Sequence, residues 1–197
     1  MAGLQTAVAA ETLPRSQAKI AGVFYLLNII TGSLALVFYG RKLAVYGNAA
    51  ILISTACYVA VTLLFFKIFK PVDSKLSLLA AFFSLVGCSV GALSPFHLLP
   101  GYINSLEFFG VYCLLIGYLI LKSTFLPRSL GMLMGFGGLG WLTFLSLPLR
   151  KQLSPYNLIP GIVAEVALTA WLLAVGVNVQ KWIEQDNLRS AGISTAK

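Results

Sequence analysis

The sequence predicts an all-α protein: a polytopic transmembrane helical bundle of about six spanning helices, with cytoplasmic N- and C-termini. Of the 197 residues, 58% are hydrophobic and only 10% are charged, whereas about a quarter of the residues of a soluble domain are charged. The apolar residues form runs of about 20, the length that crosses a bilayer as a helix. The basic residues stand in ones and twos between these runs, as the flanking charges of membrane helices do.

Six apolar runs define an expected transmembrane domain over residues 20–180, and short basic or proline-containing segments separate them. The expected helices cover residues 20–39, 45–66, 76–99, 104–121, 129–149 and 157–179. Residues 1–19 are expected to form a short cytoplasmic N-terminal tail. Residues 181–197 are expected to form a polar, disordered C-terminal tail.

Charges and turn residues bound the first three helices. The first run carries no charge and lies between Lys19 and Arg41. Asp73 suits the N-cap of the third helix, because its carboxylate can accept a hydrogen bond from a free backbone N–H. That helix is expected to end before Pro100, which has no N–H with which to continue it.

Similar signals bound the last three helices. Asn104 and Glu107 have the spacing of a capping box, in which two side chains accept backbone N–H groups at a helix start. Pro127 suits the first turn of the fifth helix and Pro155 the start of the sixth, since a proline there interrupts no hydrogen bond within the helix.

The basic residues also predict the orientation of the bundle. Ten Lys and Arg residues lie in the two tails and in the loops after the second and fourth helices, and four lie in the other three loops. Because short loops rich in Lys and Arg stay in the cytoplasm, both termini are expected to be cytoplasmic.

Glycines predict close contacts between helices. Gly87 and Gly91 form a GxxxG pattern in the third helix, and Gly131 and Gly135 form another in the fifth. In lipid, such small residues allow two helix backbones to approach each other. We expect these contacts within one chain; a homo-oligomer interface is the alternative, which the sequence does not specifically indicate.

The sequence indicates no catalytic residues, no metal site and no cofactor. It has one histidine and no HExxH, GxSxG or Walker motif. Cys57, Cys88 and Cys113 each lie in an apolar run and are expected to be small buried side chains. The net charge of +8 is not gathered on one helix face, so nucleic acid is not an expected partner.

Glu165 is the strongest candidate for a functional residue. It lies about two turns inside the sixth expected helix, where an ionised carboxylate costs at least a few kcal/mol. Glu165 must therefore face the bundle interior, pair with another polar side chain or be protonated. Such acids typically serve proton relays or cation sites. The structural alternative is a neutral side chain that hydrogen-bonds across helices.

Two further candidates lie in the same half of the membrane. Glu107 is expected at the outer start of the fourth helix, where capping alone explains it. His97 is expected near the outer end of the third helix and is the only histidine of the sequence. Prolines close to both can open a helix bundle, because a broken backbone needs water or protein partners. We expect a small outward-facing polar cavity lined by His97, Glu107 and Glu165.

Three stretches resemble one known family. They are Phe108–Leu142, with Phe109-Gly110, Leu115-Ile116-Gly117-Tyr118-Leu119-Ile120, Ser123-Thr124-Phe125-Leu126-Pro127-Arg128, Gly131 and Gly138-Leu139-Gly140; Ile20-Ala21-Gly22 with Tyr25-Leu26-Leu27; and Glu165-Val166-Ala167-Leu168 with Trp171-Leu172-Leu173. On these residues the chain resembles the uncharacterised prokaryotic multi-pass membrane proteins of domain of unknown function 4386. The resemblance covers most of residues 20–177.

The resemblance implies a helical membrane protein in the prokaryotic cytoplasmic membrane and a family position at Glu165, but no activity. Relatives often carry an arginine where Ser84 stands and a longer segment between residues 39 and 49. If that arginine pairs with the acid of the last helix in relatives, the ion pair is absent here. A protonated Glu165 is then favoured.

The sequence therefore predicts an integral membrane protein without identifying a reaction or substrate. The leading hypothesis is a small transporter-like or ligand-binding bundle, with the lipid bilayer and a small ligand or ion as partners. The alternative is a non-catalytic membrane component that acts through partner or lipid interaction. An intramembrane enzyme is disfavoured, because no nucleophile stands beside a base.

Overall fold

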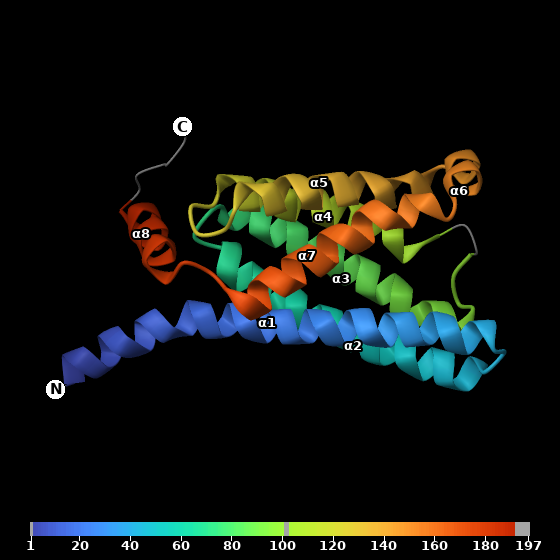
Figure 1. Cartoon of the computed structure of the whole chain (residues 1–197), viewed down its shortest axis with the longest axis horizontal. Helices are drawn as coiled ribbons and strands as arrows, with labels where there is room; N and C mark the ends of the chain where they lie inside the picture. Colours follow the sequence, from blue (N-terminus) through green and yellow to red (C-terminus); the bar gives the residue numbers. More distant parts are fainter. Residues whose placement is uncertain (1, 101–102, 192–197) are drawn as a thin grey trace.

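The computed structural model describes residues 2–100 and 103–191, and this part of the chain contains helices and no strand. The all-α prediction is confirmed, and Figure 1 shows the arrangement. The helices are α1 (Ala2–Gly40), α2 (Ala44–Phe69), α3 (Ser74–Leu93), α4 (Ser105–Lys122), α5 (Arg128–Leu142), α6 (Leu147–Leu153), α7 (Ile159–Ala174) and α8 (Val179–Ser190). Short 3₁₀ turns cover Ser94–Phe96, Thr143–Leu145 and Tyr156–Leu158.

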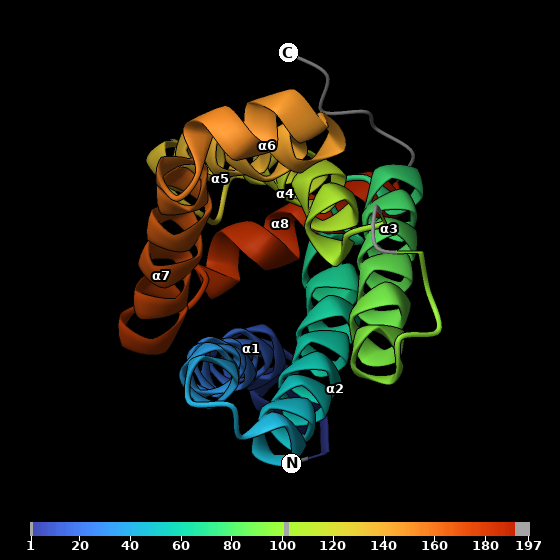
Figure 2. The ribbon, with the colours of Figure 1, turned by 90° about the vertical axis from the view of Figure 1, so that its right-hand side faces the viewer.

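Six helices form a closed ring around the core. In chain order α1 to α5 each pack against the next, and α7 closes the ring by packing against both α5 and α1. Figure 2 looks along the ring and shows α6 lying across its near end. Tyr25, Phe65, Ile116 and Leu168 are fully buried inside it. The first and last long helices are therefore neighbours.

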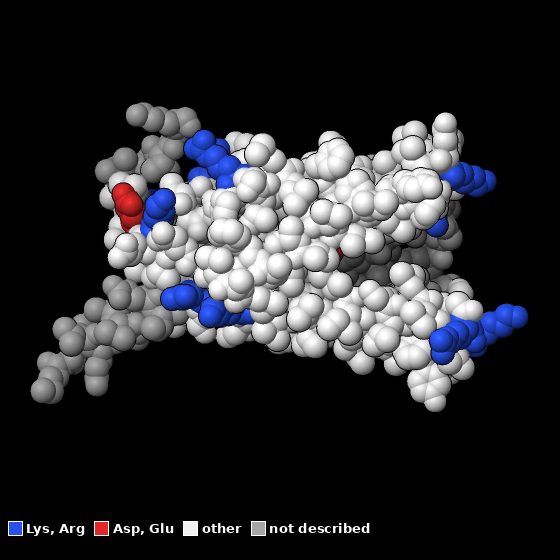
Figure 3. Space-filling view, in the orientation of Figure 1, with Lys and Arg blue, Asp and Glu red and all other residues white. Residues whose placement is uncertain are grey.

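Apolar side chains cover the outside of the ring. Val45 is 79% exposed, Leu36 72% and Phe136 60%. In Figure 3 the Lys and Arg side chains gather at the two ends of the molecule, and the band between them is almost free of charge. Soluble proteins rarely expose so large an apolar surface, whereas hydrocarbon solvates it well. The chain is therefore a multi-pass membrane protein.

Within the described residues, five helices are long and apolar enough to cross a membrane, and a bent pair of helices meets the same criteria when its two parts are taken together. The helical stretch Arg128–Leu145 meets α6 at 118°, which corrects the uninterrupted helix expected over residues 129–149. Pro148 explains the break. It has no N–H, and its ring would collide with the preceding turn of a continuous helix. It stands instead in the first turn of α6, which carries the charges of Arg150 and Lys151 across the end of the ring.

Both expected tails are largely helical. α1 begins at Ala2, so the tail expected over residues 1–19 continues the first helix, in keeping with its many alanines. α8 corrects the disorder expected from residue 181 onward. These residues form a helix because Trp182 and the buried Gln185 pack against the bundle. Met1 and residues 192–197 lie outside the described residues.

α8 packs across the end of the ring at which α1 enters it (Figure 1). The Trp182 Nε1 donates a hydrogen bond of 2.9 Å to the carbonyl of Ile68, and the Arg189 guanidinium donates to the carbonyl of Lys70. Gln185 accepts a hydrogen bond of 3.3 Å from the backbone of the loop after α4. α8 thus satisfies carbonyls that are left free where α2 ends and covers this end of the bundle.

Replacing Trp182 with phenylalanine is expected to loosen α8 without unfolding the ring. Phenylalanine keeps most of the apolar contact but cannot donate to the Ile68 carbonyl, so docking should weaken by about 1 kcal/mol. Amide hydrogen exchange in α8 should then be about fivefold faster, while exchange in α4 stays unchanged. Equal exchange in the two proteins would show that this bond does not hold α8.

Glycines let α4 and α5 approach until their backbones touch. A Cβ atom on Gly138 would lie 2.8 Å from the Gly110 carbonyl oxygen, and one on Gly117 would lie 2.7 Å from the Gly131 carbonyl oxygen. On each helix these two glycines are seven residues apart, which is about two turns. A Cβ on Gly135 would meet nothing within 4 Å. A Cβ on Gly117 would also lie 2.8 Å from the Gly135 backbone nitrogen, so the backbones of both Gly131 and Gly135 face α4 although a Cβ on Gly135 would not.

Candidate functional site

A pocket of about 750 Å³ lies where α1 and α7 separate. The two helices touch near the α8 end, where a Cβ on Gly22 would lie 3.0 Å from the side chain of Leu173. They then diverge toward α6 (Figure 1), and in Figure 3 the surface is hollowed on this side of the molecule. Residues of α1, α2, α3, α4, α5 and α7 line the pocket. It therefore extends from the α6 end of the ring into the bundle interior.

Glu165 lies on the inner wall of the pocket. It is half-buried in α7, because protein surrounds its side chain while part of its surface opens to the pocket. Its carboxyl group faces the Tyr25 hydroxyl and the Trp141 indole nitrogen, and Tyr58 and Tyr112 lie close enough to sense its charge. Glu165 thus stands among side chains that can donate hydrogen bonds to a carboxylate.

Two of these donors are buried without a partner among the described residues. Neither the Tyr112 hydroxyl nor the Trp141 Nε1–H forms a hydrogen bond of regular geometry. The Tyr25 and Tyr58 hydroxyls lie 3.4 Å apart, and their rings pack edge to face with centroids separated by 5.5 Å. Buried polar groups without partners are unusual and tend to mark functional sites.

Polar side chains continue along the wall from this inner end to the mouth. The Ser54 hydroxyl donates a hydrogen bond of 2.6 Å to the side-chain oxygen of Asn28. Nearer the mouth, the Tyr39 hydroxyl donates to the side-chain oxygen of Asn48 at 2.7 Å. His97 stands at the mouth, exposed and with φ of +54°. Polar groups therefore line the pocket from its inner end to its mouth, although most of the lining surface is apolar.

The structure brings two of the three candidate residues to one pocket. His97 and Glu165 both line it, whereas Glu107 does not. Glu107 lies in the first turn of α4, where Asn104 is the N-cap and accepts a hydrogen bond of 3.0 Å from the backbone of Leu106. The charge of Glu107 faces Arg150 of α6. Its surroundings are those of a helix start rather than of the pocket.

Acidic and basic side chains are few in the lining of this pocket. Glu165 is the only Asp or Glu that lines it among the described residues, and no Lys or Arg of that part of the chain does. Rings of Tyr58 and Phe109, whose centroids are 4.6 Å apart, lie on its wall. A pocket with this lining favours a positively charged, partly apolar occupant.

Sequence reasoning did not single out the tyrosines around Glu165. Tyr25, Tyr58 and Tyr112 were available as a signal, because each stands well inside an expected span. Tyrosines that anchor a helix at a membrane surface stand near its ends, so a tyrosine at the centre of a span needs a polar partner. Three of them in three helices could have predicted a shared polar site.

Ser84 lies away from the pocket. It is buried and shares a hydrogen bond with the Thr62 hydroxyl, with an oxygen–oxygen distance of 2.5 Å. Cys57, Cys88 and Cys113 are buried free thiols. Among the side chains that the structure describes, no cluster of three or more His, Cys, Asp or Glu is suited to a metal ion.

The chain is similar to proteins of unknown function. The family model described as domain of unknown function (DUF4386) matches residues 96–176, which confirms the resemblance over that stretch. An uncharacterised protein of Archaeoglobus fulgidus is 28% identical over 130 residues, which cover 63% of this chain and 73% of the archaeal protein. No solved structure matches the chain.

Proposed function

We propose that this protein binds a small, largely apolar cation in the pocket between α1 and α7, with Glu165 as its counter-ion. The single observation that carries the proposal is the position of Glu165. It is the one acid at the inner end of a pocket of about 750 Å³ that no Lys or Arg of the described residues lines. A cation there gains an attraction that no Lys or Arg among the described lining residues opposes.

The aromatic lining supports the same class of ligand. Tyr58, Phe109 and Trp141 present rings to the pocket, and ring faces attract ammonium groups, most strongly where water is excluded. The remaining wall is largely apolar and suits an alkyl or aryl body. A protonated or quaternary amine with one such group would satisfy both parts of the lining.

The shape of the bundle supports entry of the ligand into the pocket from one side of the membrane. The pocket begins at the α6 end, while aromatic side chains fill the core beyond it and α8 covers the opposite end. The distribution of Lys and Arg favours a cytoplasmic position for the α8 end. We propose that the protein resides in a prokaryotic cytoplasmic membrane and presents the pocket outward, as a binding protein or as the outward-open state of a small transporter.

Replacing Glu165 with glutamine is expected to weaken cation binding roughly tenfold or more, because a buried charge pair is lost while shape is preserved. The probe is radiolabelled benzyltrimethylammonium, measured by equilibrium dialysis on the purified full chain in detergent. Neopentylbenzene, its uncharged carbon isostere, is the matched ligand control and should compete weakly with the wild-type protein.

The matched control variant is Glu107→Gln, which removes the same charge outside the pocket and should bind the probe as the wild type does. A Glu165→Gln protein that folds normally and keeps full affinity would refute the proposal. Equal affinity for the cation and its uncharged isostere would refute it as well, since the pocket would then not recognise charge.

A further inference from the structure

The pocket of Glu165 is open along its side as well as at its mouth. In Figure 3, which views the molecule across its long axis, the hollow lies in the almost uncharged band between the two charged ends. Ile162 and Val166 of α7 line the pocket and are 49% and 46% exposed. Tyr58 and Trp141, which line its inner end, are only 4% and 6% exposed. The pocket is thus enclosed at its inner end and open between α1 and α7.

One face of α1 shows where the two helices part. Gly22 lies on the face that contacts α7, since a Cβ atom there would lie 3.0 Å from the side chain of Leu173. Ser33 lies about three turns farther along the same face, yet it is exposed and lines the pocket. α7 has therefore left this face of α1 before Ser33. We call the resulting opening, which Ser33, Ile162 and Val166 border, the side slot.

Polar groups accompany the side slot from the mouth of the pocket to its inner end. Along α1 the pocket extends from Tyr39 to Asn28, which is about 16 Å of helix and about half of the hydrocarbon thickness of a bilayer. The hydrogen bonds between Tyr39 and Asn48 and between Asn28 and Ser54 lie along this length. A polar headgroup can therefore approach Glu165 beside polar partners, while a chain attached to it stays in hydrocarbon.

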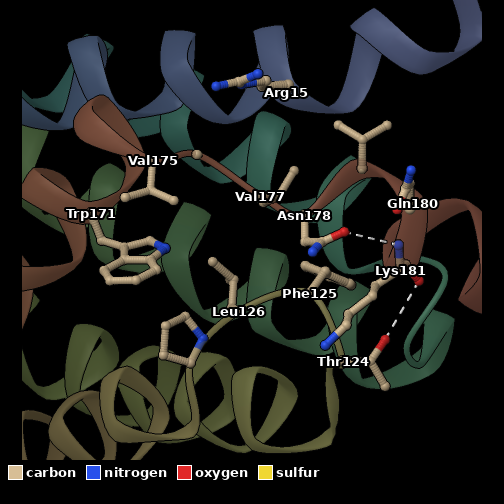
Figure 4. Close-up of a pocket in the computed structure, with 13 residues that line it drawn as sticks. Arg15, Thr124, Phe125, Leu126, Trp171, Val175, Val177, Asn178, Gln180 and Lys181 are labelled. Carbon is tan, nitrogen blue, oxygen red and sulfur yellow. Dashed lines mark hydrogen bonds between the residues drawn. The ribbon is translucent and has the colours of Figure 1, made fainter.

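The pocket at the α8 end does not lead to Glu165. It has a volume of about 530 Å³ and shares no lining residue with the pocket of Glu165. Figure 4 shows Arg15 and Lys181 on opposite sides of the connection from α7 to α8. The Thr124 hydroxyl donates to the carbonyl of Lys181 at 3.5 Å, and the Asn178 side chain accepts from the backbone N–H of Lys181 at 3.2 Å. These bonds hold the connection closed, so the side slot and the mouth both lie in the half of the molecule that contains α6.

We propose that the ligand of the Glu165 pocket is a single-chain amphiphilic amine that enters sideways from the bilayer through the side slot. Its ammonium group pairs with Glu165, and its alkyl chain passes between α1 and α7 into the hydrocarbon. This inference rests on the cation site proposed above and adds the class of the ligand and its route.

The cross-section of the side slot matches such a molecule. A charged group is costly in hydrocarbon unless polar partners surround it, and Glu165 is the acid among the described residues that line the pocket. An alkyl chain gains free energy for every methylene that stays out of water. Leu34 of α1 and Val163 of α7 are exposed outside the pocket, so a chain that leaves the side slot meets an apolar surface. Head and chain thus each keep suitable surroundings.

The test compares two competitors of radiolabelled benzyltrimethylammonium, on the full chain in lipid nanodiscs. Dodecyltrimethylammonium carries the long chain, and ethyltrimethylammonium has the same headgroup without it. Equilibrium dialysis relates displacement to the free concentration of each competitor. The dodecyl compound should act at a concentration at least about a hundredfold lower, because each methylene kept in hydrocarbon can add about fourfold in affinity.

Two tryptophan variants of α1 test whether the chain uses the side slot. Ser33→Trp places an indole at the edge of the side slot and should reduce the ratio of the two affinities by at least about tenfold. Leu34→Trp places the same ring at the next residue, which is exposed but does not line the pocket, and should keep the wild-type ratio. Because the ratio compares two ligands on one protein, a partial loss of folded protein does not change it.

A photoreactive diazirine at the far end of the dodecyl chain locates that end. Labelling that excess benzyltrimethylammonium removes should fall on exposed residues of α1 and α7 beside the side slot. Labelling of α2, α3 or α4 that the same competitor removes would show that the chain folds back inside the pocket, and it would overturn the proposal.

The outcomes separate this proposal from the cation site itself. No saturable binding of benzyltrimethylammonium to the wild-type protein would refute the cation site and the present proposal together. Saturable binding with equal potency of the dodecyl and ethyl competitors would refute the present proposal alone. An equal ratio in Ser33→Trp and in the wild type would do the same, since the side slot would then not be the route of the chain.

Discussion

The Gly138→Val variant is expected to lose most of its resistance to unfolding. The Cβ of residue 138 would lie 2.8 Å from the Gly110 carbonyl oxygen and 3.0 Å from the Leu114 backbone nitrogen. These are backbone atoms of a neighbouring helix, which cannot rotate away. α4 and α5 must therefore separate, at an expected cost of about 3 kcal/mol or more.

Alanine substitutions supply a matched comparison on the same helix. Gly138→Ala should destabilise the protein by at least about 1 kcal/mol, whereas Gly135→Ala should be neutral or slightly stabilising because alanine favours a helix. Unfolding in mixed micelles of increasing SDS content, followed by circular dichroism, measures both. Equal stability of the two alanine variants would show that α4 and α5 are not in backbone contact.

The affinity for a permanent cation is expected to rise with pH and then reach a plateau. A quaternary ammonium ion binds the carboxylate form of Glu165 in preference to the neutral acid, so binding releases a proton. By linkage, affinity should fall up to about tenfold per pH unit below the pH at which the carboxyl ionises in the unliganded protein. Equilibrium dialysis of benzyltrimethylammonium between about pH 5 and pH 8 measures this slope.

Two variants separate Glu165 from the other titratable groups of the pocket. Glu165→Gln should abolish most of the pH dependence, and His97→Gln, which removes the titratable group at the mouth, should preserve it. Tyr25, Tyr58 and Tyr112 also face Glu165, but phenols are neutral throughout this pH range. A slope that persists in Glu165→Gln and disappears in His97→Gln would assign the linkage to the histidine.

The approximate number of apolar spans could be predicted from the sequence because each span depends on its own composition. A run of about 20 apolar residues is sufficient to predict a span, and caps such as Asp73 and Asn104 follow local rules that the structure reproduces. Glu165 could be singled out for the same local reason. An acid inside an apolar run is expensive wherever the other helices lie.

What could not be predicted depends on distant parts of the chain. The separation of Glu107 from the pocket follows from the rotation of α4, whose Leu106 and Phe109 line the pocket while Glu107 does not, and this rotation is fixed only by packing. The order of α8 comes from contacts of Trp182 with α2, more than 100 residues away. The group of tyrosines around Glu165 comes from three helices whose relative rotation is fixed only by packing.

The closure of the ring between α1 and α7 has a consequence for how the protein is made. A ribosome delivers α1 first and α7 last among the helices of the ring, so the inner end of the Glu165 pocket is incomplete until synthesis has nearly finished. Until then the polar face of α1 around Asn28 has only α2 as a neighbour. A nascent chain that stalls before α7 would expose that face to lipid, where quality-control proteases of the membrane could recognise it.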